Sequence, residues 1–252
     1  MDLRVIAQVG RSSIVYTALG IAVCLTVGTL LARTFHVGQK TGLLISIGTA
    51  ICGGSAIAAA APTLRPREDE VAVALATVFL LNAVALFVFP LIGHAVALDQ
   101  EHFGLWAALA IHDTSSVVGA AMAYGPQALE VATVVKLARA LWIVPVTLGL
   151  GWMVSHRRGA PGDGRVHKAP KPWFIAAFLG AAAVVTTFPS LRPIGHQVSS
   201  VAKHLMSATM FLIGAGLTRS ALRTMGVLPF LMGAALWLVV AGLSLCAVVL
   251  WS

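Results

Sequence analysis

One stretch of the sequence places ionisable and hydroxyl side chains inside an otherwise apolar run. The run 105–124 is interrupted by five consecutive polar residues, which are His112, Asp113, Thr114, Ser115 and Ser116. A carboxylate is costly in membrane hydrocarbon and normally faces a partner or a hydrated cavity there. Asp113 is therefore the most informative residue of the chain. It is expected either to carry a proton or cation, or to cap a half-helix that begins at the interruption.

Two cationic residues lie within a later apolar run. Lys136 and Arg139 are three positions apart, so on a helix they project from one face. In one interpretation they contact an anion or neutralise Asp113. In another, the hydrocarbon begins near Leu137 and both side chains reach the membrane interface, as long cationic side chains do at helix ends. The sequence leaves both interpretations open.

Paired glycines mark a second interruption. Gly53, Gly54 and Ser55 lie in the run 41–61, directly ahead of a stretch of small residues. Glycine pairs weaken the continuity of a helix. If a half-helix begins here, its free N–H groups and positive dipole end favour an anion. The alternative is that these residues only allow close helix packing, and both can hold.

Membrane-spanning helices are expected to position these residues. Of the 252 residues, 58% are hydrophobic and only 10% are charged, whereas soluble domains have about 25% charged residues. The apolar runs are continuous rather than alternating, which predicts helices and not barrel strands. About eight spans are expected, at 12–32, 41–61, 71–93, 105–124, 132–154, 173–189, 200–218 and 227–251. The predicted fold class is an all-α, polytopic membrane helix bundle with two broken helices.

The only long polar loop, at 155–172, is expected to divide one transmembrane domain of residues 1–252 into two sub-bundles. These sub-bundles would comprise residues 1–154 and 173–252. Because the loop is rich in Arg and Lys, it is expected on the cytoplasmic side.

The basic residues outside this loop give a conflicting orientation. If every run crosses the membrane fully, Arg33 and Lys40 are cytoplasmic, whereas Arg65 and Arg67 fall on the opposite side. This arrangement opposes the rule that basic residues stay in the cytoplasm. The conflict indicates that one or more runs do not cross as simple rods.

The sequence lacks the motifs of several functional classes. The net charge of +8 comes largely from short loops rather than one basic face, so no nucleic-acid partner is expected. No P-loop, dinucleotide-binding motif or nucleophile elbow is present, and Cys24, Cys52 and Cys246 form no metal-ligand pattern. We therefore expect no enzymatic activity, no cofactor and no metal. An intramembrane hydrolase would rest only on the pair His112 and Asp113.

Interrupted helices are typical of transporters, which expose backbone groups to a solute near mid-membrane. Three long motifs also make the sequence resemble the bacterial YeiH-type, or sulfate exporter, family of inner-membrane proteins. They read GLLISIGTAICGGSAIAAAAP at 42–62, FGLWAALAIHDTSSVVGAAMAYG at 103–125 and ATVVKLARALWIVPV at 132–146. The stretch 211–233 is also similar, so the resemblance covers almost the whole chain.

The resemblance implies a multi-pass secondary transporter of sulfate or a related sulfur oxyanion such as sulfite. It also implies an architecture like that of cation/proton antiporters, in which two broken helices cross at mid-membrane. The family motifs fall on 52–55, on 112–114 and on Lys136 with Arg139. The expected partners are the lipid bilayer and a small anionic solute, with a homodimer as a further expectation, in the bacterial inner membrane.

The sequence departs from the family pattern in two ways, and these departures suggest an alternative function. The family motif continues after His-Asp with T-A-Q-V, whereas this chain has Ser116 in place of the Gln. Relatives also usually begin with further spans before the stretch equivalent to 3–33. A late start codon, a natural short form and a degraded gene are open explanations. The alternative to a transporter is therefore a non-transporting membrane subunit or an inactive remnant.

Overall fold

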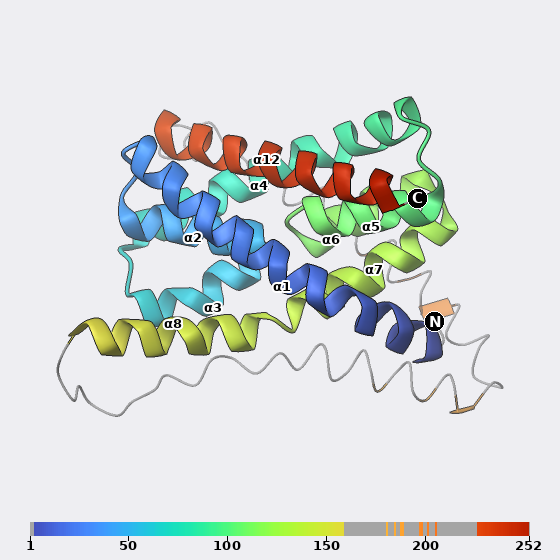
Figure 1. Ribbon diagram of the computed structural model, residues 1–252, viewed down its shortest axis with the longest axis horizontal. Helices are drawn as coiled ribbons and strands as arrows, with labels where there is room; N and C mark the ends of the chain where they lie inside the picture. Colours follow the sequence, from blue (N-terminus) through green and yellow to red (C-terminus); the bar gives the residue numbers. More distant parts are fainter. Residues whose placement is uncertain are drawn as a thin grey trace.

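The computed structural model describes residues 3–158 and 226–251, with single positions between 180 and 205, and the elements in the two continuous ranges are α-helices (Figure 1). The expected spans 173–189 and 200–218 lie almost entirely outside the described residues. So do the loop beyond position 158 and most of the second expected sub-bundle. The division into two sub-bundles therefore stays a prediction.

Four of the expected spans are confirmed as apolar helices long enough to cross a membrane. They lie in α1 (Leu3–Thr34), α4 (Glu68–Ala95), α7 (Pro126–Ala140) continued by α8 (Ile143–Arg158), and α12 (Val227–Trp251). A turn at 141–142 separates α7 from α8.

The run 41–61 does not cross the molecule but forms a hairpin. Its arms are α2 (Gln39–Ala50) and α3 (Gly54–Leu64). The Nζ of Lys40, at the start of α2, donates a hydrogen bond to the carbonyl oxygen of Arg65, just after α3, at 2.6 Å. A continuous passage through both arms would instead separate these residues by more than about 30 Å, at 1.5 Å per residue. We call this element hairpin 1.

The run 105–124 folds back in the same way. Its arms are α5 (Gln100–Ala110), which Asp99 caps, and α6 (Thr114–Tyr124). The hydroxyl of Tyr124 donates to the carbonyl oxygen of Leu98 at 2.5 Å, so the end of α6 lies beside the start of α5. We call this element hairpin 2. The expectation of two interrupted helices is confirmed, but the expectation that they cross, drawn from the antiporter resemblance, differs from this geometry.

The two hairpins enter the bundle from opposite ends. Hairpin 1 ends where α4 begins, and hairpin 2 begins just after α4 ends, so the 28 residues of α4 separate their open ends. Each arm has 11 or 12 residues, about 17 Å, which is roughly half of a 30 Å hydrocarbon core. The tips of the hairpins therefore meet near the middle of the molecule (Figure 1).

The two halves of this arrangement share a few residues at a spacing of sixty positions. Ala50 and Ile51 match Ala110 and Ile111, Ser55 matches Ser115, and the triplet Glu-Val-Ala at 70–72 occurs again at 130–132. The bounds of α3 and α6 differ by the same sixty positions. The two hairpins point in opposite directions along α4, and each is followed by a long helix.

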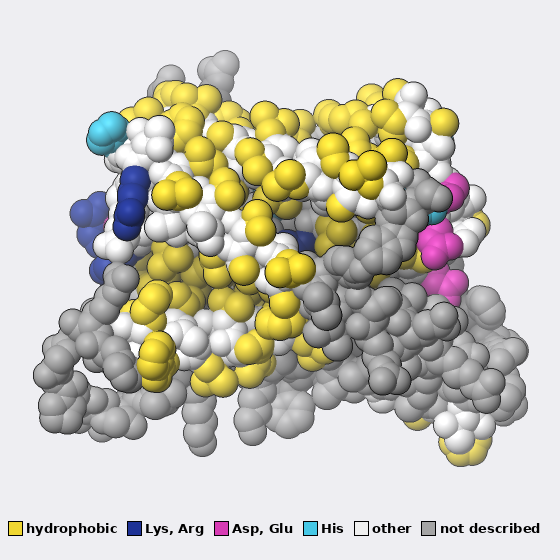
Figure 2. All heavy atoms as spheres, in the orientation of Figure 1, with side chains coloured by type: hydrophobic (Ala, Val, Ile, Leu, Met, Phe, Trp, Pro, Cys, Tyr) yellow, Lys and Arg dark blue, Asp and Glu magenta, His cyan; other side chains and the backbone are white. Residues whose placement is uncertain are grey.

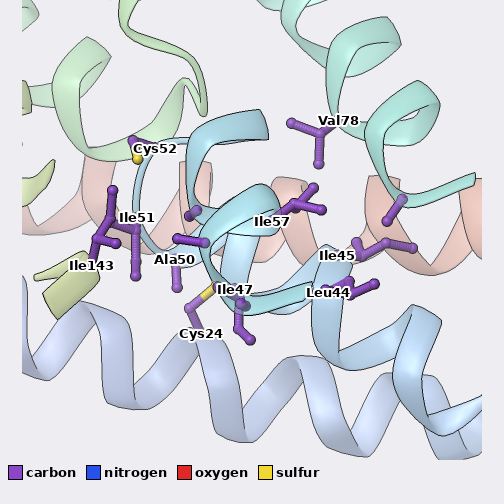
Figure 3. Close-up of a cluster of buried hydrophobic side chains, with 14 of the residues drawn as sticks. Cys24, Leu44, Ile45, Ile47, Ala50, Ile51, Cys52, Ile57, Val78 and Ile143 are labelled. Carbon is purple, nitrogen blue, oxygen red and sulfur yellow. The ribbon is translucent and has the colours of Figure 1, made fainter. Parts of the chain in front are cut away.

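Packing fixes the tips between the long helices. A buried apolar cluster surrounds hairpin 1, with Ile47, Ile51 and Ile57 directed into it (Figure 3). Reciprocal indole bonds join α12 to α5: Trp237 Nε1 donates to the carbonyl oxygen of Ala110 at 3.2 Å, and Trp106 Nε1 to that of Ala241 at 3.0 Å. Hairpin 2 is thus hydrogen-bonded to α12, and hairpin 1 is packed in an apolar cluster.

Candidate functional site

The candidate site lies where the two hairpin tips touch. Gly53, in the first tip, has φ +69° and ψ −127°. A Cβ placed on Gly53 would lie 3.5 Å from the backbone nitrogen of Asp113 in the second tip. This close approach brings the two interruptions predicted from the sequence, sixty residues apart, into one place.

Asp113 is the N-cap of α6. Its Oδ2 accepts hydrogen bonds from the backbone N–H of Ser115, at 2.9 Å, and from the Ser115 hydroxyl. The capping interpretation of Asp113 is therefore confirmed, since an N-cap carboxylate satisfies one of the free N–H groups that open a helix. Its role as a proton or cation carrier stays a prediction.

Asn82 of α4 holds the second tip in place from the other side. Its Oδ1 accepts from the backbone N–H of His112 at 3.1 Å and from that of Asp113 at 3.2 Å. Asn82 is not among the residues predicted from the sequence. It could have been found there, because an amide in the apolar run 71–93 needs a partner in lipid just as Asp113 does.

Lys136 and Arg139 of α7 bind carbonyl oxygens at the C-terminal ends of the first arms. Lys136 Nζ donates to Ile111 at 2.6 Å and to Ala108 at 3.4 Å. Arg139 Nε donates to Ala50 at 2.8 Å, at the end of α2, and its Nη1 donates to Leu109 near the end of α5. Each cation therefore compensates a negative helix end.

The interpretation in which Lys136 and Arg139 reach the membrane interface is wrong. Their exposed fractions are 0% and 2%, because both side chains are enclosed between the hairpins. The ion pairs among the described residues join Arg67 to Asp69 and Asp99 to His102, so neither buried cation forms one with Asp113. Both cations act on backbone dipoles instead.

The N-terminal ends of α3 and α6 carry the hydroxyl groups of the site. Ser55 is exposed, and it donates to the Cys52 carbonyl oxygen at 3.4 Å. Gly54, Asp113, Thr114, Ser115 and Ser116 are half-buried, whereas Gly53 and His112 are buried. We call the exposed and half-buried residues of the two tips the rim of the site, and the buried residues beneath them its floor.

Buried polar atoms without a hydrogen-bond partner occur on the second tip and on the helices that flank the tips. They are both ring nitrogens of His112, Nδ2 of Asn82 on α4 and Oγ1 of Thr49 near the end of α2, in side chains no more than 3% exposed. Thr49 was not identified from the sequence, where a hydroxyl in a helix ordinarily means a bond to the preceding turn. Among the described residues, no group of three or more His, Cys, Asp or Glu side chains has the arrangement of a metal site.

Two opposed hairpins, whose polar tips meet among long apolar helices, define a polytopic α-helical membrane protein. The chain belongs to the family described as Conserved hypothetical protein 698, whose model matches residues 1–233, and the resemblance to the YeiH-type family is thereby confirmed. No solved structure matches the chain.

Relatives from several bacteria are named UPF0324 membrane proteins. One from Bdellovibrio bacteriovorus is 55% identical, and the match covers 99% of this chain and 76% of the relative. One from Geobacter sulfurreducens is 48% identical over 100% of this chain and 79% of the relative. One from Porphyromonas gingivalis is 47% identical over 96% and 72%. These names support a membrane protein.

Proposed function

We propose that this protein is a secondary transporter that carries a small anion, sulfate or a related sulfur oxyanion such as sulfite, across the bacterial inner membrane. The observation that carries the proposal is the contact between Gly53 and Asp113, at the tips of hairpins that enter from opposite ends. A solute held there is half a membrane away from either side. Small movements of one hairpin against the bundle would open the site to one side at a time.

The electrostatics of the tips favour an anion. The negative ends of α2 and α5 are neutralised by Arg139 and Lys136, whereas the positive ends of α3 and α6 begin at the rim. Free N–H groups at a helix start and the dipole of that helix both attract negative charge. The two buried cations exceed the single carboxylate of Asp113, so they also supply countercharge.

The rim residues have distinct roles in this proposal. Gly53 and Gly54 bring the backbone of the first tip close to the solute, while Ser55, Thr114, Ser115 and Ser116 offer hydroxyl donors. Asp113 is the coupling or gating carboxylate, because binding or release of a proton there changes the charge beside the solute and the cap of α6.

Flux measurements on the purified full chain in proteoliposomes test the proposal. We expect uptake of sulfite or sulfate above that of protein-free liposomes, with a rate that depends on the imposed pH gradient. Asp113→Asn should preserve the cap, since Asn is as good an N-cap as Asp, and should remove the pH dependence. Asp99→Asn is the matched control, because Asp99 caps α5 at the exposed end of hairpin 2.

Unchanged pH-dependent flux in Asp113→Asn would eliminate the coupling role while leaving transport intact. Absence of flux of either anion from the folded wild-type chain would contradict transport itself and would favour the non-transporting alternative.

A further inference from the structure

We propose that the direct ligands of the solute are three buried, uncharged side chains at or beside the tips, the amide of Asn82, the hydroxyl of Thr49 and the imidazole of His112. The inference rests on the proposed function and specifies where the anion sits. It assigns binding to Asn82 and Thr49, which lie on α4 and α2, and it leaves Lys136 and Arg139 as countercharges that do not touch the solute.

The orientation of the Asn82 amide is set by its neighbours. Its oxygen accepts two backbone N–H groups from the second tip, so the reverse orientation would place the amino group against two donors. The amino group must therefore face away from the tip backbone. It presents two N–H donors, and neither has a partner, in a side chain that is 3% exposed. Buried donors are rarely left unpaired, because each has given up its hydrogen bonds to water without gaining a partner.

The Thr49 hydroxyl is unlike other hydroxyls of these helices. Those of Ser46, Thr77 and Thr147 each donate to the carbonyl oxygen four residues earlier. Thr49 lies in the last turn of α2 and makes no such bond, although it is only 2% exposed. Its hydroxyl is therefore free to donate to a group that enters from the tip.

His112 contributes the third ligand. Both of its ring nitrogens lack a partner, and its exposed fraction is 1%. The charged groups near it are Lys136, which bonds the carbonyl oxygen of Ile111, Arg139, which bonds that of Leu109, and the adjacent Asp113. A neutral imidazole always has one N–H, which can donate to an oxyanion.

The three side chains lie on adjoining elements. Asn82 reaches the backbone of His112 directly. On the other side, a Cβ placed on Gly233 of α12 would lie 3.4 Å from Ile45 and 3.6 Å from Leu81, so α2 and α4 meet there. Thr49 is one helical turn beyond Ile45, and Asn82 follows Leu81. Both residues thus follow that contact by no more than about one helical turn.

Uncharged donors suit a solute that must also leave. A transport site has to bind its solute favourably enough for entry and weakly enough for release. The cations cannot turn toward the solute without releasing the carbonyl oxygens of α2 and α5 that they bind. Neutral donors can hold an anion in contact while the charges of Lys136 and Arg139 act on it from behind.

Binding measurements on the full chain in detergent test the inference, with sulfite and sulfate as probes. Asn82→Asp keeps an oxygen for the two tip N–H groups but removes the amino donors and adds negative charge. Thr49→Val removes the hydroxyl at nearly constant shape. We expect each variant to weaken the affinity by about tenfold or more, and Thr77→Val to leave it unchanged. Thr77 is the matched control because its hydroxyl already bonds to Val73.

Thermal stability without anion separates folding from binding. Variants that keep the wild-type melting temperature and bind both probes with wild-type affinity would overturn the inference, and would show that the free polar atoms serve only internal water. The proposed function would survive that result. A wild-type chain that binds neither probe would overturn both proposals. If Asn82→Asp proves unstable, Thr49→Val against Thr77→Val decides alone.

Discussion

The buried ammonium group of Lys136 binds backbone carbonyl oxygens, and its positive charge also acts on the neighbouring site. Its ammonium group lies on the carbonyl oxygens of Ile111 and Ala108, where α5 ends without further helical bonds. The C-terminal carbonyls of a helix always need partners, and they need them most where water is absent. The cation is therefore what allows a helix to end at mid-depth.

Replacement of this ammonium group is predicted to loosen hairpin 2. Lys136→Met keeps the length of the side chain but leaves the Ile111 carbonyl oxygen buried without a donor, at a cost of about 1–3 kcal/mol. We expect the melting temperature of the purified chain to fall by roughly 2–10 °C without added solute. Lys40→Met is the control, because Lys40 makes a similar bond to Arg65 at an exposed position. Equal melting temperatures for Lys136→Met and wild type would exclude this role.

The residues of the site were only partly predictable from the sequence. Asp113 and its neighbours stand out because polar side chains are rare in apolar runs, and the structure gathers them with Gly53 and Gly54 at the two tips. Asn82 and Thr49 were missed, because a single amide or hydroxyl in a span has ordinary local explanations. Only the hydrogen bonds of the folded chain show that Thr49 lacks a local partner and that Asn82 holds the opposite tip.

The sequence predicts where the two helices are interrupted, but it does not predict that the chain turns back there to form hairpins. The runs 41–61 and 105–124 are each about as long as a crossing helix, and their interruptions were identified correctly. Whether a chain continues or turns back after an interruption depends on a few dihedral angles and on tertiary contacts, which hydropathy does not report. Here the turn in hairpin 1 depends on Gly53, whose φ of +69° and ψ of −127° are readily adopted by glycine but not by residues with a Cβ.

A side chain at position 53 is predicted to disturb that turn. In Gly53→Ala, the added Cβ would make ordinary contacts of 3.4–3.6 Å with Val78 and Asp113, so the penalty comes from the backbone angles. Such strain costs about 1–3 kcal/mol. We expect a lower melting temperature together with slower anion flux, since the tip must shift to relieve the strain.

Gly149→Ala provides the control for this change. Gly149 lies within α8, and nothing lies within 4 Å of a Cβ placed there. Alanine favours helix over glycine by up to about 1 kcal/mol, so this variant should be as stable as wild type or more stable. If Gly53→Ala behaves like Gly149→Ala, the positive φ at the tip is not required.

The fold-back of hairpin 1 also removes a conflict in the orientation of the whole molecule. When the run 41–61 is counted as a crossing, Arg65 and Arg67 fall on the side opposite to Arg33 and Lys40. The bond between Lys40 and Arg65 places all four at one end, as the rule for basic residues requires. On the face shown in Figure 2, most of the visible Lys and Arg side chains lie at one end and the Asp and Glu side chains at the other, and mainly apolar side chains lie between them, with one further basic patch near the middle.

Labelling of single cysteines from each side of the membrane tests this topology. In a chain whose native cysteines are replaced, Gln39→Cys and Glu68→Cys lie at exposed positions before and after hairpin 1, and Glu101→Cys lies at the exposed start of hairpin 2. We expect the first two to react with a membrane-impermeant thiol reagent from the same side, the cytoplasmic one, and the third to react only from the other side. A helix that crossed the membrane between Gln39 and Glu68 would expose their cysteines to opposite sides. That result would remove the opposed hairpins, and with them the mid-membrane site on which both proposals stand.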